Sequence, residues 1–200
     1  MTSALHRRLA LALALIVPGC AAFDPGCDTS IADGLVPAWG PEVPYFPTPD
    51  PAVTAMLELA GTGPKDVVYD LGAGDGRIVI AAATHFGARG VGVEIDPAPL
   101  RMAAYNACRA GVARRVRFER EDIFKADIRE ATVVTLFLFE DVNRRLLPKL
   151  ESELAPGTRI VAYRYGFGDA WAPEKTIEVG GRPIFLWTVP ERRLSERGSK

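Results

Sequence analysis

The stretch that decides the fold of this 200-residue chain is Val67-Val68-Tyr69-Asp70-Leu71-Gly72-Ala73-Gly74-Asp75-Gly76-Arg77. Its first five residues are mostly apolar and predict a short strand that is covered on both faces. The three glycines that follow let the backbone turn sharply and approach a ligand closely. From Gly76 to Phe86 the apolar residues have helical spacing, so the turn opens a helix whose first N–H groups are unpaired.

The same alternation of strand and helix extends on both sides of this stretch. The other predicted strands are Gly90–Ile95, Val116–Glu119, Ala131–Phe139 and Thr158–Tyr165, and the other predicted helices are Pro51–Leu59, Pro97–Ala110 and Val142–Leu154. Near the C-terminus, Lys175–Val179 and Arg182–Val189 flank Gly180-Gly181, a hairpin signal. The sequence therefore predicts an α/β fold with a Rossmann-like open sheet, mostly parallel, that ends in an antiparallel hairpin.

Acidic residues follow three consecutive predicted strands, whose carboxyl ends meet at one edge of a parallel sheet. Asp70 precedes the glycines, and Glu94 ends the next strand, where a carboxylate can accept hydrogen bonds from ribose hydroxyls. Asp122 follows the third strand and could meet an adenine amino group, while Ile123 could cover the ring. Each acid also has a purely structural alternative, since such residues cap turns and helix starts.

The spacing of the glycines and acids favours one kind of ligand. The pattern is Gly-x-Gly-x-Gly, whereas the dinucleotide pattern is Gly-x-Gly-x-x-Gly. Asp70 and Asp75 would repel a pyrophosphate but attract a ligand with a cationic sulfonium and ammonium. The sequence therefore predicts S-adenosylmethionine as cofactor, and no metal site, because the cysteines and histidines lack ligand spacing. The predicted cofactor-binding residues are Asp70, Gly72, Gly74, Asp75, Gly76, Glu94, Asp122 and Ile123.

Two segments carry a resemblance to known families. Val67–Arg77 resembles the first motif of class I S-adenosylmethionine-dependent methyltransferases. Tyr45-Phe46-Pro47-Thr48-Pro49, followed by Asp70–Val79, resembles the lysine methyltransferase family related to the mitochondrial ATP-synthase c-subunit methyltransferase, which has small bacterial and archaeal members. The resemblance implies that the proline-rich segment folds over the cofactor, with Tyr45 and Thr48 as catalytic-site residues. The alternative is a brace that only packs on the domain.

The acceptor side is predicted at the end of the strand that leads to Glu140. This strand lacks the Asp/Asn-Pro-Pro-Tyr of enzymes that methylate exocyclic base amines. A lysine acceptor must be neutral to attack, and an apolar aromatic slot lowers its pKa. Candidates for such a slot are Tyr45, Phe46, Phe139, Tyr163, Tyr165 and Trp171, although the pattern favours the core for Phe139 and Tyr163. Glu140 could hold an incoming lysine or simply begin the next helix.

Two features expected from the resemblance are absent. The resemblance implies a proline near Glu140 and a Ser-His pair at the positions where this sequence has Ala162-Tyr163. The sequence therefore predicts a methyltransferase that acts on protein lysines, with two alternatives: a small-molecule methyltransferase, or an exported domain that keeps the fold without activity. The net charge of -1 gives no general attraction to nucleic acid, so none is predicted as a partner.

The N-terminus has the pattern of a targeting segment. Residues 1–8 are basic without an acid, and Leu9–Val17 is an apolar run too short to span a bilayer as a helix. Val17-Pro18-Gly19-Cys20 loosely resembles a lipoprotein cleavage box with Cys20 as the lipidated residue. We expect a signal or anchor in residues 1–22, a linker in 23–43, the methyltransferase domain in 44–190 and a polar tail in 191–200. The basic flank predicts export, which conflicts with a cofactor made in the cytosol and leaves a cytoplasmic location open.

Overall fold

The computed structural model of the protein describes residues 47–191. The predictions for the leader, the linker, Tyr45, Phe46 and most of the C-terminal tail lie outside these residues. No helix within residues 47–191 is long and apolar enough to cross a membrane.

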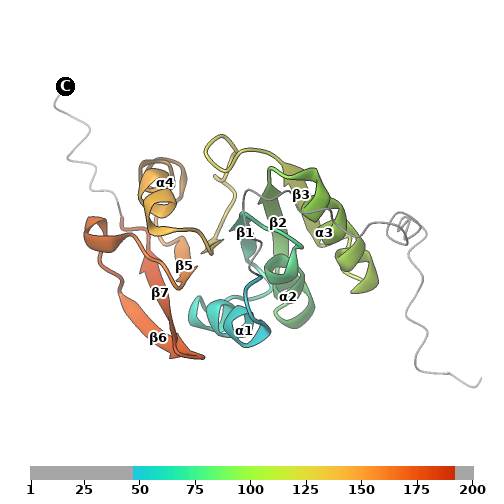
Figure 1. Ribbon diagram of the computed structural model, residues 1–200, viewed down its shortest axis with the longest axis horizontal. Coiled ribbons are helices and arrows are strands. Elements are labelled where there is room, and N and C mark those ends of the chain that lie inside the picture. The colour runs from blue at the N-terminus through green and yellow to red at the C-terminus, as the bar shows by residue number, and fades with distance from the viewer. Residues whose placement is uncertain (1–46, 192–200) are drawn as a thin grey trace, which may run out of the picture.

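The described strands form one seven-stranded sheet in the order β3-β2-β1-β4-β5-β7-β6 (Figure 1). The strands are β1 Val67–Leu71, β2 Arg89–Glu94, β3 Val116–Arg120, β4 Val133–Leu136, β5 Arg159–Tyr163, β6 Lys175–Val179 and β7 Arg182–Thr188. Strands β1 to β5 pair in parallel, whereas β7 runs antiparallel to both β5 and β6. The predicted fold class, with its antiparallel C-terminal hairpin, is confirmed.

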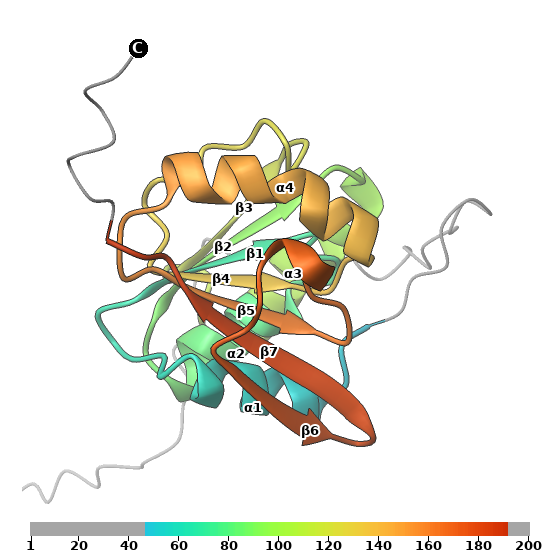
Figure 2. The same ribbon diagram turned by 90° about the vertical axis from the view of Figure 1, so that its left-hand side faces the viewer.

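Helices cover both faces of the sheet (Figure 2). One layer holds α1 Asp50–Leu59, α2 Arg77–His85 and α3 Pro97–Arg109, and the other holds α4 Glu140–Glu153; a short 3₁₀ helix, η1, spans Gly168–Ala170. Val68 of β1 packs in the cluster that contains α1 and α2 residues, while Tyr69 packs in the cluster that contains α4 residues. Because β1 is buried on both faces, its sequence is an apolar run rather than an alternating one.

The main difference from the predicted elements lies between β4 and α4. The predicted strand Ala131–Phe139 is only Val133–Leu136 in the sheet, and α4 begins at Glu140 instead of Val142. The physical reason is the first turn of the helix, where the carboxylates of Glu140 and Asp141 interact favourably with the helix dipole. Residues 137–139 are therefore free of the sheet and form a loop at its carboxyl edge.

The strand order reverses beside β1. From β1 the chain moves outward through β2 to β3, then crosses back to β4 on the other side of β1. Such a reversal leaves room for a ligand outside the carboxyl ends of the strands. The glycine turn after β1 lies at this point, with the end of β2 on one side and the end of β4 on the other.

Candidate active site

The glycine turn is fixed to the end of β2 by backbone hydrogen bonds. The N–H groups of Gly72 and Ala73 both donate to the carbonyl of Val93, each at 2.9 Å. Gly72, Gly74 and Gly76 all have positive φ, a conformation that favours glycine. A Cβ added to Gly76 would lie 2.7 Å from the ring of Phe118, so the turn could not close with a larger residue there. The turn after β1 therefore requires glycine at these three positions.

Glu94 joins the loops that follow β1 and β2. Its Oε2 accepts a hydrogen bond from the N–H of Gly74 at 3.1 Å, and its Oε1 accepts one from the N–H of Asp96 at 2.9 Å. The helix cap of α3 is Asp96, whose carboxylate accepts from the N–H of Ala98 at 2.8 Å. Glu94 therefore leaves the capping of α3 to Asp96, and each of its oxygens keeps a lone pair for a ligand.

Asp70 is a buried acid inside an acidic cluster. Its carboxylate accepts a hydrogen bond from the Oγ1 of Thr135 on β4 at 2.8 Å. Burial, with smaller contributions from the nearby carboxylates of Asp75 and Glu94, raises the pKa of Asp70 from 3.8 to about 7, against the opposing effect of the Thr135 bond. Three acids held this close favour a cationic ligand, so the residues present fit the sulfonium and ammonium of S-adenosylmethionine.

Asp75 and Arg77 connect the glycine turn to the start of the described chain. Asp75 accepts hydrogen bonds from the Nε of Arg77 at 3.0 Å and from its Nη2 at 2.7 Å. The Nη1 of Arg77 donates to the backbone carbonyl of Thr48 at 3.0 Å and lies 3.8 Å from the carboxylate of Asp50. Thr48 is buried. The structure thus places Thr48 next to the glycine turn, where its backbone carbonyl is bound by Arg77.

The loop after β3 holds Asp122 and Ile123. Asp122 Oδ1 accepts a hydrogen bond from the N–H of Phe124 at 3.0 Å, which closes a local turn. Ile123 is half-buried and packs against the core cluster on the α4 face. The turn role proposed as the alternative for Asp122 is therefore present, alongside its place at the carboxyl edge.

Two large apolar side chains are exposed among residues 47–191: Ile95 at 63% and Phe139 at 61%. A single exposed apolar side chain is ordinary on a protein surface. These two, however, both lie at the carboxyl edge of the sheet, Ile95 directly after Glu94 and Phe139 directly before Glu140. Ile95 thus directly follows the acid that is predicted to bind the ribose, and no sequence pattern singled it out.

The aromatic residues predicted for the acceptor slot divide into two groups. Phe139 and Tyr165 face each other across the loops after β4 and β5, with ring centroids 5.5 Å apart. Tyr163 is buried against Phe137. Trp171 is half-buried and stacks on the buried ring of Phe167, so both aromatics pack with the core. Of the predicted aromatics in the described residues, Phe139 and Tyr165 thus meet at the sheet edge.

Glu140 is exposed and lies beside η1. A Cβ added to Gly168 would fall 2.6 Å from the Oε1 of Glu140, so this carboxylate rests against the backbone of the short helix. Glu140 is also the first residue of α4, as the alternative interpretation of this residue predicts. Because it follows Phe139, it also lies at the edge of the sheet where the acceptor is predicted.

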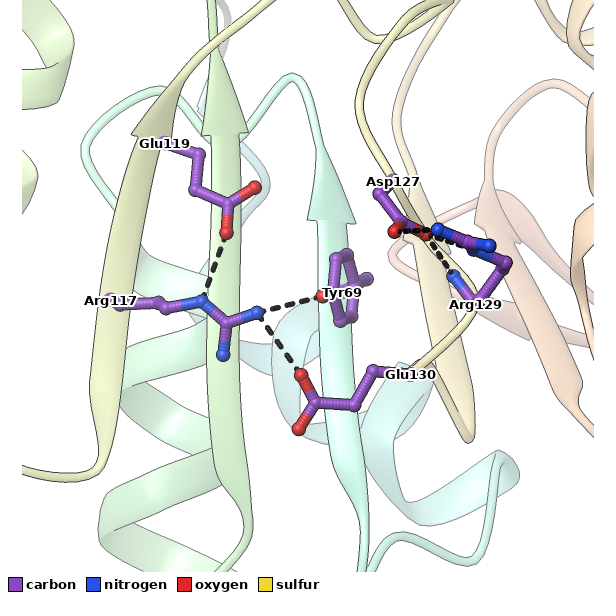
Figure 3. A pocket seen from close by; sticks show the side chains of 6 residues that line it. All are labelled: Tyr69, Arg117, Glu119, Asp127, Arg129 and Glu130. Atoms are coloured by element: carbon purple, nitrogen blue, oxygen red, sulfur yellow. Dashed lines mark hydrogen bonds and ion pairs between the residues drawn. The ribbon is translucent and has the colours of Figure 1, made fainter.

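A hollow of about 480 Å³ lies away from this edge, on the α4 face of the sheet (Figure 3). It is lined by Tyr69, Arg117, Glu119, Asp127, Arg129 and Glu130. Arg117 donates to the Tyr69 hydroxyl at 2.8 Å, to Glu119 at 2.9 Å and to Glu130 at 3.1 Å, and Asp127 pairs with Arg129. Because the charged groups that line the hollow are paired with one another, it offers no reactive centre.

Polar side chains that sequence patterns did not reveal also support the site. Thr135 contacts Asp70, and Asn106 on α3 donates to the backbone carbonyl of Asp75 at 3.0 Å. Asn143 on α4 contacts the loops after β4 and β5. The sequence signal for such residues is a polar side chain on an otherwise apolar face of a helix or strand. This signal indicates that the side chain is buried, but it does not identify its hydrogen-bond partner.

A glycine turn after β1, an acid at the end of β2 and this strand order define a class I S-adenosylmethionine-dependent methyltransferase. Comparison with known proteins gives the same class and a narrower group. The chain belongs to the ANTKMT methyltransferase domain family, whose profile matches residues 70–175.

Characterised relatives cover most of the described residues. A protein-lysine N-methyltransferase from Saccharolobus islandicus is 44% identical over 158 residues, which are 76% of this chain and 98% of that protein. The adenine nucleotide translocase lysine N-methyltransferase of mouse is 33% identical over 74% of this chain and 64% of its own length. The lysine N-methyltransferase of the ATP synthase c-subunit from Caenorhabditis elegans is 33% identical over 72% of this chain and 80% of its own length.

A solved structure supports the cofactor. The crystal structure described as an RNA methyltransferase from Salinibacter ruber in complex with S-adenosyl-L-homocysteine is 52% identical, with a TM-score of 0.72. It covers 74% of this chain and 96% of the crystallised one. S-Adenosylhomocysteine is what remains of S-adenosylmethionine after methyl transfer, so the predicted cofactor is confirmed.

Proposed function

We propose that this protein transfers the methyl group of S-adenosylmethionine to the Nζ of lysine side chains in proteins. The observation that carries the proposal is the edge formed by Phe139 and Tyr165, 5.5 Å apart, with the carboxylate of Glu140 next to it. A lysine side chain has an apolar stem and a cationic end, which fit aromatic rings and a carboxylate respectively. The relatives from Saccharolobus, mouse and C. elegans, which are all named as lysine methyltransferases, support the same acceptor.

The residues of the chain contribute mainly by positioning and by excluding water. Bound S-adenosylmethionine supplies an electrophilic methyl group on a sulfonium. A lysine amine must lose its proton before it can attack. The carboxylate of Glu140 favours the charged ammonium as it arrives, and loss of water beside the rings of Phe139 and Tyr165 then disfavours it. As the new nitrogen–carbon bond forms, the carbon–sulfur bond breaks, and the proton released earlier has gone to solvent. Alignment of the two reactants supplies much of the rate in such a displacement.

On the cofactor side, residues at the carboxyl edge of the sheet would hold S-adenosylmethionine. Glu94 would accept hydrogen bonds from the ribose, and Ile95 would pack against the adenine ring. Asp122 would meet the adenine amino group, and Ile123 would cover the same ring from the loop after β3. Asp70 would balance the positive charge of the ligand. Gly72, Gly74 and Gly76 keep the turn free of side chains, and the Asp75–Arg77 pair holds the turn against Thr48.

RNA is the second candidate acceptor, because the Salinibacter structure carries that description. One cation, the guanidinium of Arg164, lies against the ring of Tyr165, but the carboxylates at the same edge oppose RNA. Glu140 and Asp141 open α4, and Asp169 lies in η1 beside Glu140. Phosphates are bound through clusters of Lys and Arg, and carboxylates in the same place repel them.

The deciding experiment is methyl transfer from tritiated S-adenosylmethionine to separated cell fractions of protein, RNA and small amines. We expect label in the protein fraction, recovered as methyl-lysine after acid hydrolysis. Glu94→Ala should lose this label, whereas Glu178→Ala, a matched change on the far edge strand β6, should keep it. Label found in RNA or in small amines alone would refute the lysine proposal and leave the methyltransferase assignment intact.

A further inference from the structure

The loops after β4 and β5 are tied together by one buried amide. Asn143, in the first turns of α4, is fully buried. Its Nδ2 donates to the backbone carbonyls of Tyr165 at 3.0 Å, Gly166 at 3.2 Å and Leu138 at 3.3 Å. Leu138 belongs to the loop after β4, while Tyr165 and Gly166 belong to the loop after β5. Two segments that are distant in sequence thus share a single donor.

The carbonyl oxygen of the same amide makes no such contact. The Oδ1 of Asn143 has no hydrogen-bond partner among the residues that the structure describes. Asn143 shares its helix face with the buried Leu146 and Leu150, where an apolar residue would bury no unpaired oxygen. Burying an unpaired polar atom is unfavourable, so packing alone does not account for an asparagine here. The hydrogen bonds that join the two loops do account for it.

The loop after β5 contains a strained turn. Arg164 has φ +70°, and the N–H of Tyr165 donates to the carbonyl of Tyr163 at 2.9 Å, which makes a three-residue turn centred on Arg164. A non-glycine residue in this conformation persists only where the surroundings hold it. One support is the carbonyl of Pro183 on β7, which accepts from the N–H of Arg164 at 2.8 Å, and the other is Asn143.

The turn sets the ring of Tyr165 between two neighbours. The ring of Phe139 lies 5.5 Å away, and the guanidinium of Arg164 lies 5.0 Å away. Phe139 is exposed, and the ring that it meets is that of Tyr165 on the neighbouring loop. The position of Phe139 relative to Tyr165 therefore depends on the tie between their loops.

We propose that Asn143 is a positioning residue: by joining the loops after β4 and β5 through its amide, it fixes the Phe139–Tyr165 pair as the wall that receives the apolar stem of the acceptor lysine. This inference rests on the proposed lysine acceptor. Asn143 does not touch the reacting atoms, so its removal should act through acceptor binding and leave cofactor binding unchanged.

The test compares four forms of the full chain: wild type, Asn143→Ala, Phe139→Ala and the double variant. The acceptor probes are the purified ATP-synthase c-subunit and a synthetic peptide with one lysine. Each single variant should raise the KM for the acceptor about tenfold with little change in kcat, the effect of losing about 1.4 kcal/mol of binding. In the double variant the two losses should not multiply, since both act on one wall.

A matched control separates the two sides of the site. Asn106→Ala removes the same amide from α3, where Nδ2 contacts the carbonyl of Asp75. It should raise the Kd for S-adenosylmethionine in calorimetry and spare the acceptor KM, the reverse of Asn143→Ala. Multiplying losses in the double variant, or a changed cofactor Kd in Asn143→Ala, would overturn the proposal. Asn143→Ser, which keeps one donor, replaces the alanine variant if that one does not fold.

Hydrogen exchange tests the tie without any acceptor. In Asn143→Ala the amide of Tyr165 should exchange about tenfold faster, while the amides of Gly72 and Ala73 keep their wild-type rates, because local opening tracks local bonding. Unchanged exchange at Tyr165 would refute the positioning role. If wild type forms no methyl-lysine in the cell protein fraction, the proposed function fails, and this exchange measurement alone decides whether Asn143 joins the loops.

Discussion

Asp70→Asn should stabilise the protein while it weakens the site. The asparagine keeps the shape of the side chain, and its Oδ1 can still accept the hydrogen bond from Thr135. What changes is the charge, because an amide cannot ionise. Asp70 is buried beside two other carboxylates, and its pKa is raised from 3.8 to about 7. Ionised Asp70 therefore costs the folded protein free energy that the unfolded chain does not lose.

The size of the effect follows from linkage. Between pH 4 and pH 7 the folded protein holds a proton on Asp70 that the unfolded chain has released, so the free energy of unfolding falls as pH rises. A pKa rise from 3.8 to about 7 corresponds to a loss of about 4 kcal/mol, complete above pH 7 and absent below pH 4. Asp70→Asn removes this loss. At pH 8 the variant should be more stable than wild type by up to about 4 kcal/mol.

Urea unfolding at pH 4, 6 and 8, without cofactor, measures the difference. The free energies of unfolding should agree at pH 4 and diverge toward pH 8, with equal m-values. Asp169→Asn, an exposed acid in η1, is the control and should show no divergence. The Kd of wild type for S-adenosylmethionine should fall as pH rises through 7, since a cation favours ionised Asp70. The Kd of Asp70→Asn should be higher and should not change with pH. Parallel stability curves for wild type and variant would refute the reasoning.

Further changes test other parts of the molecule. Glu94→Ala should raise the Kd for S-adenosylmethionine at least tenfold, about 1.4 kcal/mol, in a domain that stays folded; an unchanged Kd would leave Glu94 only its contacts with Gly74 and Asp96. Gly74→Val places a β-branched residue at φ +53° where the cofactor approaches the backbone, and calorimetry should detect no binding; retained affinity in a folded variant would move the ligand elsewhere. Removal of residues 1–22 should shift the protein out of the membrane fraction on cell fractionation, and an unaltered distribution would exclude an anchoring role for that segment.

The sequence predicted the elements well because their signals are local. Strand β1 and helix α2 differ from the predicted ranges by at most a residue, since an apolar run, a glycine turn and helical spacing follow each other directly. The error at Ala131–Phe139 came from the same rule. An apolar run predicts burial, and residues 137–139 are apolar but lie in a loop because Glu140 starts a helix. Nothing within the run marks where the sheet ends.

Pairs of residues that are far apart in sequence could not be predicted in this way. The sequence indicates Asp70 by its place before the glycines, yet its hydrogen-bond partner is Thr135, 65 positions later. The resemblance indicates Thr48, and the structure shows its backbone carbonyl bound by Arg77, 29 positions later. In both cases the residue was predicted and its partner was not, since a contact between distant segments leaves no pattern in a single sequence.

The two halves of the site are therefore built on different principles. The cofactor half depends on a turn whose three glycines, Asp70 and Asp75 lie within the eleven residues Val67–Arg77, so much of its chemistry can be inferred from one stretch of sequence. The acceptor half depends on loops after β4 and β5 that meet through a side chain of α4. Changes in either loop can alter the acceptor without disturbing the cofactor turn, which is how one fold can serve different methyl acceptors. We therefore expect changes at Phe139 and Tyr165 to alter the choice of acceptor, and changes at Asp70 and Glu94 to alter cofactor binding.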